Sequence, residues 1–176
     1  TLTYIENNIN EPTASTNRYV SVSGGGSHNG TSEAKAWTLS EAMSNVVGGQ
    51  TVWVKKGLYT SASGFNLKKS GTDTNPIVFK GYDTTIGDQD NDYIVDTFSY
   101  GTPANAASQV DPTKFPVLDG DNVSSGTSGI DFNAETNIIV KNIQSKEYYY
   151  GFYSANGSNI HLENCTAGLR STNKSY

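Results

Sequence analysis

Two stretches near the end of the sequence repeat one another, and this repeat constrains the fold more than any other feature. They read NIIVKNIQS (137–145) and NIHLENCTA (159–167) and lie 22 residues apart. Both keep asparagine at their first and sixth positions and carry apolar residues in the same alternation between them. A repeat of about 20 to 50 residues that contains short strands is typical of a solenoid, in which each repeat forms one coil of the chain.

The repeat extends backwards as two short patterns that recur in the same order. The first pattern is a glycine followed by an apolar and a polar residue, and the second is an alternating strand that ends at a bend. The first occupies 64–67, 129–132 and 151–154, and the second occupies 77–82, 138–143 and 160–165. Three copies in register predict about three coils whose equivalent strands stack in parallel, roughly 4.8 Å apart.

Alternation within the second pattern predicts which side chains face the interior. The inward residues would be Ile138, Val140 and Ile143 of one coil and Ile160, Leu162 and Cys165 of the next, while Ile139 and Lys141 would point outward below His161 and Glu163. Lys141 and Glu163 would then form a cross-strand pair of opposite charge. Asn142 would lie beneath Asn164 at the bend, where stacked side-chain amides satisfy each other, and Gly81 takes this position in the first copy.

One segment, TLSEAMSNVV (38–47), has the periodicity of a helix. Its apolar residues recur at three- and four-residue spacing on a single face. Thr38 and Glu41 have the spacing of a capping box, in which each side chain satisfies a free backbone N–H at the start of the helix. Gly48 and Gly49 follow as a helix end. The apolar face of this helix has to cover another part of the protein.

The composition indicates which binding partners and which cellular compartment are expected for the protein. Hydrophobic residues make up 35 % of the chain and charged residues 16 %, with Asn, Ser, Thr and Gly filling the difference, which favours short strands joined by turns. The net charge of −5 argues against nucleic acid and anionic lipid as partners, and no apolar run reaches the length of a membrane span. No signal peptide is visible, and the composition favours a secreted or cell-surface protein in processed form.

Three stretches resemble the first part of a known family. They are RYVSVSGGGSHNGTSEAKAWTLSEAMSNVVGGQTVWVKKGLYT (18–60), SGTDTNPIVFKGY (70–82) and FPVLDGDN (115–122). They are similar to the N-terminal cap and first coils of right-handed parallel β-helix proteins of the pectate-lyase-like superfamily, above all secreted lyases of alginate, chondroitin or pectin. The resemblance covers roughly 18–167. It implies no catalytic set, because in these lyases the catalytic bases and the calcium-binding acids usually lie on later coils.

The resemblance and the repeat together imply a fold and an organisation. We expect an all-β, right-handed parallel β-helix (solenoid) with an N-terminal capping α-helix, about three coils and an open C-terminal end. Residues 1–17 would hold an N-terminal strand, TLTYI, and a linker, and 18–50 would hold the cap with helix 38–47. Residues 51–176 would form the coils, interrupted by an insertion at about 83–128.

The insertion contains a candidate calcium site. Asp88, Asp90, Asp92 and Asp96 alternate along GDQDNDYIVD, and a hard cation such as Ca²⁺ prefers several oxygen ligands. The spacing does not fit an EF-hand, and a solvated acidic loop is the alternative interpretation. Asp119 and Asp121 in LDGDN could add a second acidic site, or they could belong to an Asp-Gly turn.

A run of tyrosines provides a candidate sugar site. Tyr148, Tyr149, Tyr150 and Tyr153 fall in KEYYYGFYS (146–154), where Phe152 should point inward and Tyr153 outward. A tyrosine ring offers a flat apolar face and a hydroxyl, which suits carbohydrate, although aromatic packing within a turn would give the same sequence.

Catalytic residues are harder to assign from the sequence. His28 and His161 have no nucleophile or carboxylate at a recognisable spacing, so no Ser-His-Asp triad can be built. Cys165, the lone cysteine, occupies an inward position and is interpreted as a small core residue rather than a nucleophile. In a lyase, the base draws a proton from the carbon next to a uronate carboxylate, and Lys141 and Arg170 are the candidates.

Two functions of different class follow. The first is an extracellular protein of the polysaccharide-lyase-like class that binds or processes acidic polysaccharide, with its β-elimination chemistry beyond residue 176. The second is a non-catalytic adhesin or filament subunit. Its partner would be a further β-helix copy that stacks on the open C-terminal rung or pairs with the strand TLTYI.

Overall fold

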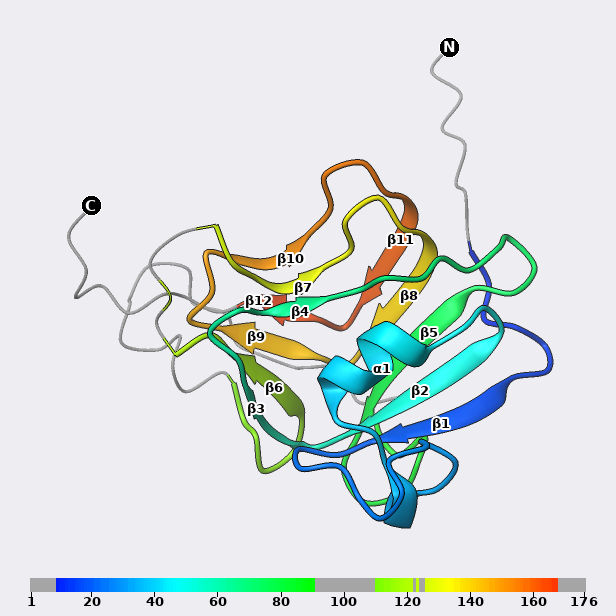
Figure 1. Cartoon of the computed structure of the whole chain (residues 1–176), viewed down its shortest axis with the longest axis horizontal. Helices are drawn as coiled ribbons and strands as arrows, with labels where there is room; N and C mark the ends of the chain where they lie inside the picture. The colour runs from blue at the N-terminus through cyan, green and yellow to red at the C-terminus, as the bar shows by residue number, and fades with distance from the viewer. Residues whose placement is uncertain (1–8, 91–109, 122, 124–125, 168–176) are drawn as a thin grey trace.

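The fold is built from parallel β-sheets. The structure, a computed structural model, describes residues 9–90, 110–121, 123 and 126–167. The first sheet has the order β1-β2-β5-β8-β11, the second β12-β9-β6-β3 and the third β10-β7-β4 (Figure 1). Every pair of neighbouring strands in the three sheets is parallel, so the predicted all-β class and the parallel stacking of strands are confirmed.

The chain passes through the three sheets in rotation, which explains the repeat in the sequence. The first sheet contains β1 (Thr16–Val20), β2 (Gln50–Lys55), β5 (Ile77–Tyr82), β8 (Thr136–Lys141) and β11 (Ser158–Glu163). The second contains β3 (Gly57–Thr60), β6 (Pro116–Asp119), β9 (Gln144–Lys146) and β12 (Thr166–Ala167), and the third contains β4 (Phe65–Asn66), β7 (Ser128–Asp131) and β10 (Tyr150–Tyr153). From β2 to β12, each strand belongs to the next sheet in this rotation.

The register of the strands follows the repeated patterns. Ile138 of β8 pairs with Ile77 of β5 on one side and with Ile160 of β11 on the other. In the third sheet, Ile130 pairs with Phe65 and with Phe152. The alignment of three copies that the sequence predicted is therefore the alignment of three neighbouring strands in the first sheet and of three in the third.

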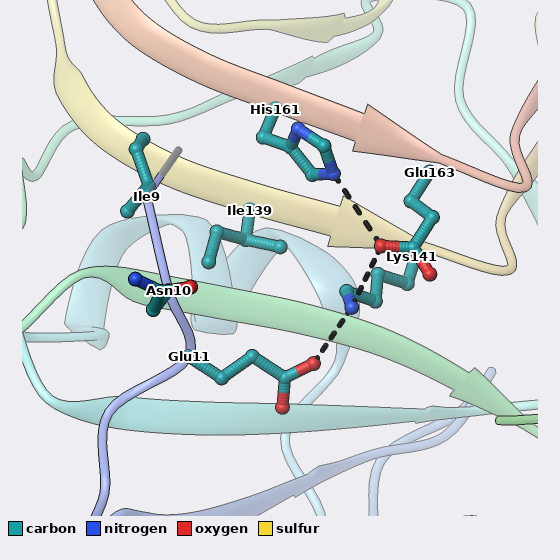
Figure 2. A pocket seen from close by; sticks show the side chains of 7 residues that line it. All are labelled: Ile9, Asn10, Glu11, Ile139, Lys141, His161 and Glu163. Atoms are coloured by element: carbon teal, nitrogen blue, oxygen red, sulfur yellow. Dashed lines mark hydrogen bonds and ion pairs between the residues drawn. The ribbon is translucent and has the colours of Figure 1, made fainter. Parts of the chain in front are cut away.

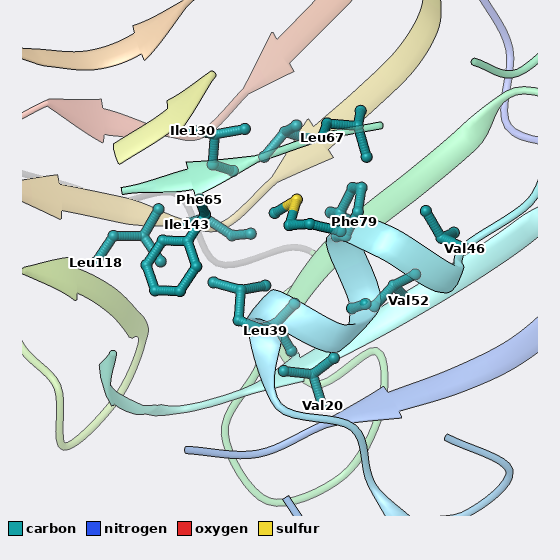
Figure 3. Close-up of a cluster of buried hydrophobic side chains, with 14 of the residues drawn as sticks. Val20, Leu39, Val46, Val52, Phe65, Leu67, Phe79, Leu118, Ile130 and Ile143 are labelled. Atoms are coloured by element: carbon teal, nitrogen blue, oxygen red, sulfur yellow. The ribbon is translucent and has the colours of Figure 1, made fainter. Parts of the chain in front are cut away.

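The core lies between the sheets and is closed on one side by a helix. Helix α1 (Leu39–Asn45) buries Leu39, Ala42 and Met43, and Figure 3 shows Leu39 among core side chains contributed by the strands. The predicted capping box is confirmed, because Glu41 N donates to Thr38 Oγ1 at 3.3 Å and Thr38 N donates to Glu41 Oε2 at 2.7 Å. A short 3-10 helix, η1 (Glu33–Lys35), precedes it.

Helix α1 is shorter than the predicted segment 38–47. It ends at Asn45, and Val46 has an extended backbone with ψ of 148°. Val46 is nevertheless fully buried, whereas Val47 is 50 % exposed. The apolar spacing placed both valines on the helical face, but β-branched residues lower helix propensity, so the last predicted turn is extended.

Asparagines with an unusual backbone conformation lie near both ends of strands β8 and β11. Asn137, Asn142, Asn159 and Asn164 all have positive φ, between 51° and 59°. Asn164 Nδ2 donates to Asn142 Oδ1 at 2.6 Å, which confirms the predicted stack, and Asn159 Nδ2 donates to Asn137 Oδ1 at 2.9 Å. A glycine is needed at position 81 of the first copy, because a Cβ there would collide with the carbonyl oxygen of Asn142.

The predicted inward residues are buried in the copy that contains β8 and less buried in the copy that contains β11. Ile138, Val140 and Ile143 are fully buried, and Ile160 and Cys165 pack against the core while remaining partly buried. Leu162 was predicted to be an interior residue, but its side chain is not buried, since Leu162 is 42 % exposed. Strand β11 is the outermost strand of its sheet among the described residues, so no described strand lies beyond Leu162 to cover it.

Candidate functional site

Three tyrosines near β10 form an exposed aromatic surface, here called the tyrosine patch. Tyr149, Tyr150 and Tyr153 are 44 %, 42 % and 38 % exposed. The rings of Tyr150 and Tyr153 are stacked, with centroids 4.9 Å apart and an interplanar angle of 20°. The ring of Tyr149 meets that of Tyr150 edge to face at 4.6 Å. These distances lie in the range of stabilising aromatic pairs.

The position of the patch follows from strand β10. Phe152 of this strand pairs in register with Ile130 and packs against the core, so the neighbouring Tyr153 points outward as predicted. The turn before the strand is held because the backbone N–H groups of Tyr149 and Tyr150 donate to the carbonyl oxygen of Thr127 at 3.1 and 3.3 Å. The patch therefore rests on hydrogen-bonded backbone rather than on a free loop.

Tyr148 does not join this patch. Its side chain is only 3 % exposed, and its hydroxyl donates to the carbonyl oxygens of Ser61 at 2.9 Å and Asp119 at 3.2 Å. Burial raises the pKa of Tyr148 above its ordinary value. Tyr148 thus tethers its turn to β6 and to the residue that follows β3, and the sugar role predicted for the run stays a prediction for the other three tyrosines.

A second feature lies on the outer face of the first sheet. A pocket of about 270 Å³, here called the outer pocket, opens where residues 9–11 cross this face (Figure 2). Its lining combines charged and apolar side chains from this segment and from strands β8 and β11. The lining residues are Ile9, Asn10, Glu11, Ile139, Lys141, His161 and Glu163.

An ion-pair network runs along this pocket. Lys141 Nζ lies 2.8 Å from Glu163, which confirms the predicted cross-strand pair, and 2.9 Å from Glu11. Lys80 Nζ lies 3.4 Å from the same Glu11 carboxylate and 2.9 Å from Asp90. His161 Nε2 completes the network at 3.4 Å from Glu163.

The network determines the protonation of Lys141. Burial by itself would lower the pKa of Lys141, but hydrogen bonds and charge from Glu163 and Glu11 outweigh it and raise the pKa above 10.5. The hydrogen bond from Lys141 lowers the pKa of Glu163. Lys141 therefore carries its proton at neutral pH, which argues against the role of general base considered for it. Arg170, the other candidate, lies outside the described residues.

The acidic residues predicted to bind calcium have other partners where they are described. The Asp88 carboxylate accepts from the backbone N–H groups of Asp83, Thr84 and Thr85, and Asp90 pairs with Lys80. No group of three or more candidate metal ligands comes together within the described part of the chain. Asp92 and Asp96 lie outside it, so a calcium site in this loop stays a prediction.

The remaining candidates occupy structural positions. Asp119 pairs with Lys146 at 3.0 Å and accepts from the backbone N–H of Asp121, as the alternative turn interpretation expects. His28 lies 2.9 Å from Glu41 of the capping box. Burial raises the pKa of Cys165 to about 11, which suits a core thiol rather than a nucleophile.

Sequence reasoning missed two members of the network, Glu11 and Lys80. Lys80 and Lys141 occupy the same position in IVFKGY and IIVKNI, so the repeat did contain a signal for stacked lysines that need an anion between them. Nothing in the local pattern around Glu11 indicated that it supplies this anion. No helix among the described residues is long and apolar enough to cross a membrane.

Comparison with known proteins gives distant relatives. No family model matches the chain. Pectate lyase PEL9 of Emericella nidulans is 26 % identical over 159 residues, which cover 84 % of this chain and 32 % of that protein. The uncharacterized protein YwoF of Bacillus subtilis is 34 % identical over 80 residues, which cover 46 % of this chain and 17 % of that protein.

Comparison of structures gives a likeness in fold. The GH136 lacto-N-biosidase of Eubacterium ramulus superposes with a TM-score of 0.53 at 13 % identity, over 86 % of this chain and 26 % of that enzyme. The chain thus spans about a third or less of the proteins that it matches. It is similar in sequence to a pectate lyase and in fold to a glycosidase.

Proposed function

We propose that this chain belongs to an extracellular, right-handed parallel β-helix protein that binds or processes acidic polysaccharide. The rotation of the chain through three parallel sheets supports the solenoid, with the three sheets as its faces and α1 as its cap. The sequence similarity to a pectate lyase supports membership of the pectate-lyase-like superfamily and a uronate polymer as the ligand. The protein would act outside the cell or at its surface.

The tyrosine patch is the observation that carries this proposal. Stacked, exposed tyrosine rings present apolar faces on which the C–H face of a sugar can pack, while their hydroxyls reach sugar oxygens. The function of this patch would be to hold the polymer. The chemistry of a lyase would come from other coils.

Binding to defined saccharides tests the proposal. We would titrate the chain with oligogalacturonate, oligoalginate and a neutral galactan and follow binding by calorimetry. Tyr150→Ala and Tyr153→Ala should each weaken binding of the acidic oligosaccharide roughly threefold to tenfold, because a stacked ring contributes about 0.5–1.5 kcal/mol beyond its buried area. Tyr153→Phe, which keeps the ring, should bind nearly as the wild type does.

The control is Val47→Ala, which changes an exposed apolar residue outside the patch. It should leave the affinity unchanged. Absence of binding to all three saccharides, or equal binding by the two alanine variants and the wild type, would overturn the role proposed for the patch.

A structural subunit is the second candidate function. The observation that favours it is the exposed Leu162 on β11, the outermost strand of the first sheet in the described part of the chain. A further copy could add its own strands there, since an open sheet edge is a template for strand addition. Ordered fibres of this chain, seen by electron microscopy, would support the subunit, and a concentration-independent monomer in sedimentation would exclude it.

A further inference from the structure

The outer face of the first sheet is covered, although its residues alternate away from the core. Val78 and Ile139 are neighbours in register and alternate with core residues of β5 and β8, so they point outward. They are nevertheless only 0 % and 1 % exposed. Residues 9–11, here called the strap, cross this face with Ile9 over β8 and Asn10 over β5 (Figure 2). The strap therefore lies beside the outward-facing Ile139 at the outer pocket.

Two lysines lie on the same face as Val78 and Ile139. Lys80 of β5 and Lys141 of β8 are direct neighbours in register, and adjacent parallel strands lie only about 4.8 Å apart. Like charges in this position repel each other, so the pair needs an anion between them. The Glu11 carboxylate supplies it, at 3.4 Å from Lys80 and 2.9 Å from Lys141.

The lysine pair is held in place by groups other than Glu11. The Lys80 side chain is 7 % exposed and pairs with Asp90. Its Nζ lies 5.1 Å from the centroid of the Trp53 ring. Lys141 pairs with Glu163 on the next strand. Both ammonium groups thus keep a partner when the strap lifts, and a site whose groups are fixed in advance loses less entropy when it binds.

We propose that Lys80 and Lys141 form a carboxylate-binding site on the outer face of the first sheet, that Glu11 occupies it as an internal ligand, and that the carboxylate of a uronic acid residue replaces Glu11 when the strap lifts. The choice of an acidic sugar rests on the proposed function. The site itself is separate from the tyrosine patch, which belongs to the third sheet.

The surroundings of the lysine pair suit one acidic sugar residue. Val78 and Ile139 would offer an apolar surface to the ring, while the two lysines take its carboxylate. The outer pocket beside Lys141 has about 270 Å³, just below the range of about 300–1,000 Å³ for pockets that hold drug-sized molecules. His161 and Asn10 add polar groups at its wall for sugar hydroxyls.

Removal of the internal ligand provides the test. Glu11→Gln should bind a galacturonic acid trisaccharide more tightly than the wild type, and a gain of about tenfold would correspond to a strap that is closed in about nine wild-type molecules of ten. The matched control is Glu33→Gln. It removes the carboxylate that pairs with Lys55 and changes the net charge by the same amount as Glu11→Gln. It should bind as the wild type does. No difference between the two variants would overturn the proposal.

A second measurement locates the ligand without depending on lysine variants. The trisaccharide is first converted to its N-hydroxysuccinimide ester and the carbodiimide is quenched, so that Asp90 and Glu163 are not activated; mass spectrometry should then find the sugar on Lys80 or Lys141 in Glu11→Gln and little on them in the wild type. Coupling confined to other lysines would contradict the site.

Lysine variants provide a third test. Lys80→Met and Lys141→Met, each in the Glu11→Gln background and checked for folding by tryptophan fluorescence, should abolish the gain in affinity.

The outcomes separate this site from the proposed function. Loss of binding in Tyr150→Ala without any gain in Glu11→Gln would leave the tyrosine patch standing and remove the lysine site. A gain in Glu11→Gln that persists in Tyr150→Ala would establish the lysine site by itself. A glutamate-rich peptide that binds Glu11→Gln in place of the trisaccharide would show that the site does not take a sugar.

Discussion

Four asparagines at the ends of β8 and β11 combine two properties that few residue types share. Each has a positive φ, a backbone conformation that costs most L-residues about 1–2 kcal/mol and that asparagine and glycine tolerate. Each also has a side-chain amide, and the pairs Asn137–Asn159 and Asn142–Asn164 are joined by hydrogen bonds along the stack. Glycine could supply the conformation but not the hydrogen bond.

Substitution of Asn142 should separate these two properties. Asn142 is 3 % exposed, and its Nδ2 donates to the carbonyl oxygen of Gln89 at 3.1 Å. We expect Asn142→Ala to lower the free energy of unfolding by about 2–4 kcal/mol, because it adds backbone strain and leaves buried polar groups without a partner. Asn142→Gly should lose about 1 kcal/mol less, since glycine is not strained at positive φ.

Urea denaturation of the two variants beside the wild type measures these differences. If Asn142→Gly were as unstable as Asn142→Ala, backbone strain would not contribute at this corner. If both were as stable as the wild type, the stacked amides would have no part in holding the coils together.

Between elements, the strap and the strands β5, β8 and β11 are joined by charge. Burial would raise the pKa of Glu11, but hydrogen bonds and charge from Lys141 and Lys80 outweigh it and lower the pKa below 4.5. The pKa of Glu163 is also lowered, and that of Lys141 is raised above 10.5. A lowered carboxyl pKa stabilises the fold above the unfolded-state pKa, and a raised lysine pKa stabilises it below the unfolded-state pKa.

The contribution of this network should therefore be greatest between about pH 4.5 and pH 10.5. At pH 7 the double variant Glu11→Gln/Glu163→Gln should have a free energy of unfolding about 1 kcal/mol below that of the wild type. The difference is small because each part-exposed ion pair contributes little. The difference should shrink as the pH falls below 4.5 and the carboxylates of the wild type become protonated. Chemical denaturation at a series of pH values measures it, and a difference independent of pH would contradict the assignment.

The sequence predicted what depends on periodicity. The 22-residue repeat identified the neighbours Asn142 and Asn164, and the alternation within each copy placed Lys141 beneath Glu163. The capping box of Thr38 and Glu41 was also readable, because its two hydrogen bonds depend on residues three positions apart. These features are set by local spacing and by a register that repeats.

The features that the sequence did not predict depend on distant segments. Alternation gives the face on which Leu162 lies, but its exposure depends on whether another strand covers it. Tyr148 is buried while the next two tyrosines are exposed, because its hydroxyl reaches carbonyl groups of two other coils. The position of the strap also depends on distant segments, since no sequence pattern around Glu11 indicates that this segment crosses the sheet.

At the scale of the molecule, the sheets in the described part of the chain differ at their two ends. Helix α1 packs against the core beside β4, at one end of the third sheet. At the other end, Leu162 is exposed although its neighbour in register, Val140, is fully buried. This difference can be measured as a difference in the cost of truncating side chains.

Truncation of the Leu162 side chain should lower the free energy of unfolding much less than truncation of a buried side chain. Leu162→Ala should lower the free energy of unfolding by less than about 1 kcal/mol, whereas Leu118→Ala, at a fully buried position, should cost about 2–5 kcal/mol. Thermal and urea denaturation of both variants at low protein concentration measures the two costs. An equal cost at both positions would mean that another surface covers Leu162 in solution.

The rotation of the chain through three sheets also sets how quickly the protein can fold. From β2 onward, no strand pairs with the strand that follows it in sequence, so a ladder between these strands forms only after a full circuit of the chain. Even the closest partners, such as Asn142 and Asn164, are separated by 22 residues. Proteins dominated by such non-local pairing fold in milliseconds to seconds rather than microseconds. Among the described strands, the shortest circuits span 22 residues and join β7 to β10, β8 to β11 and β9 to β12, so the folding nucleus should form among these strands.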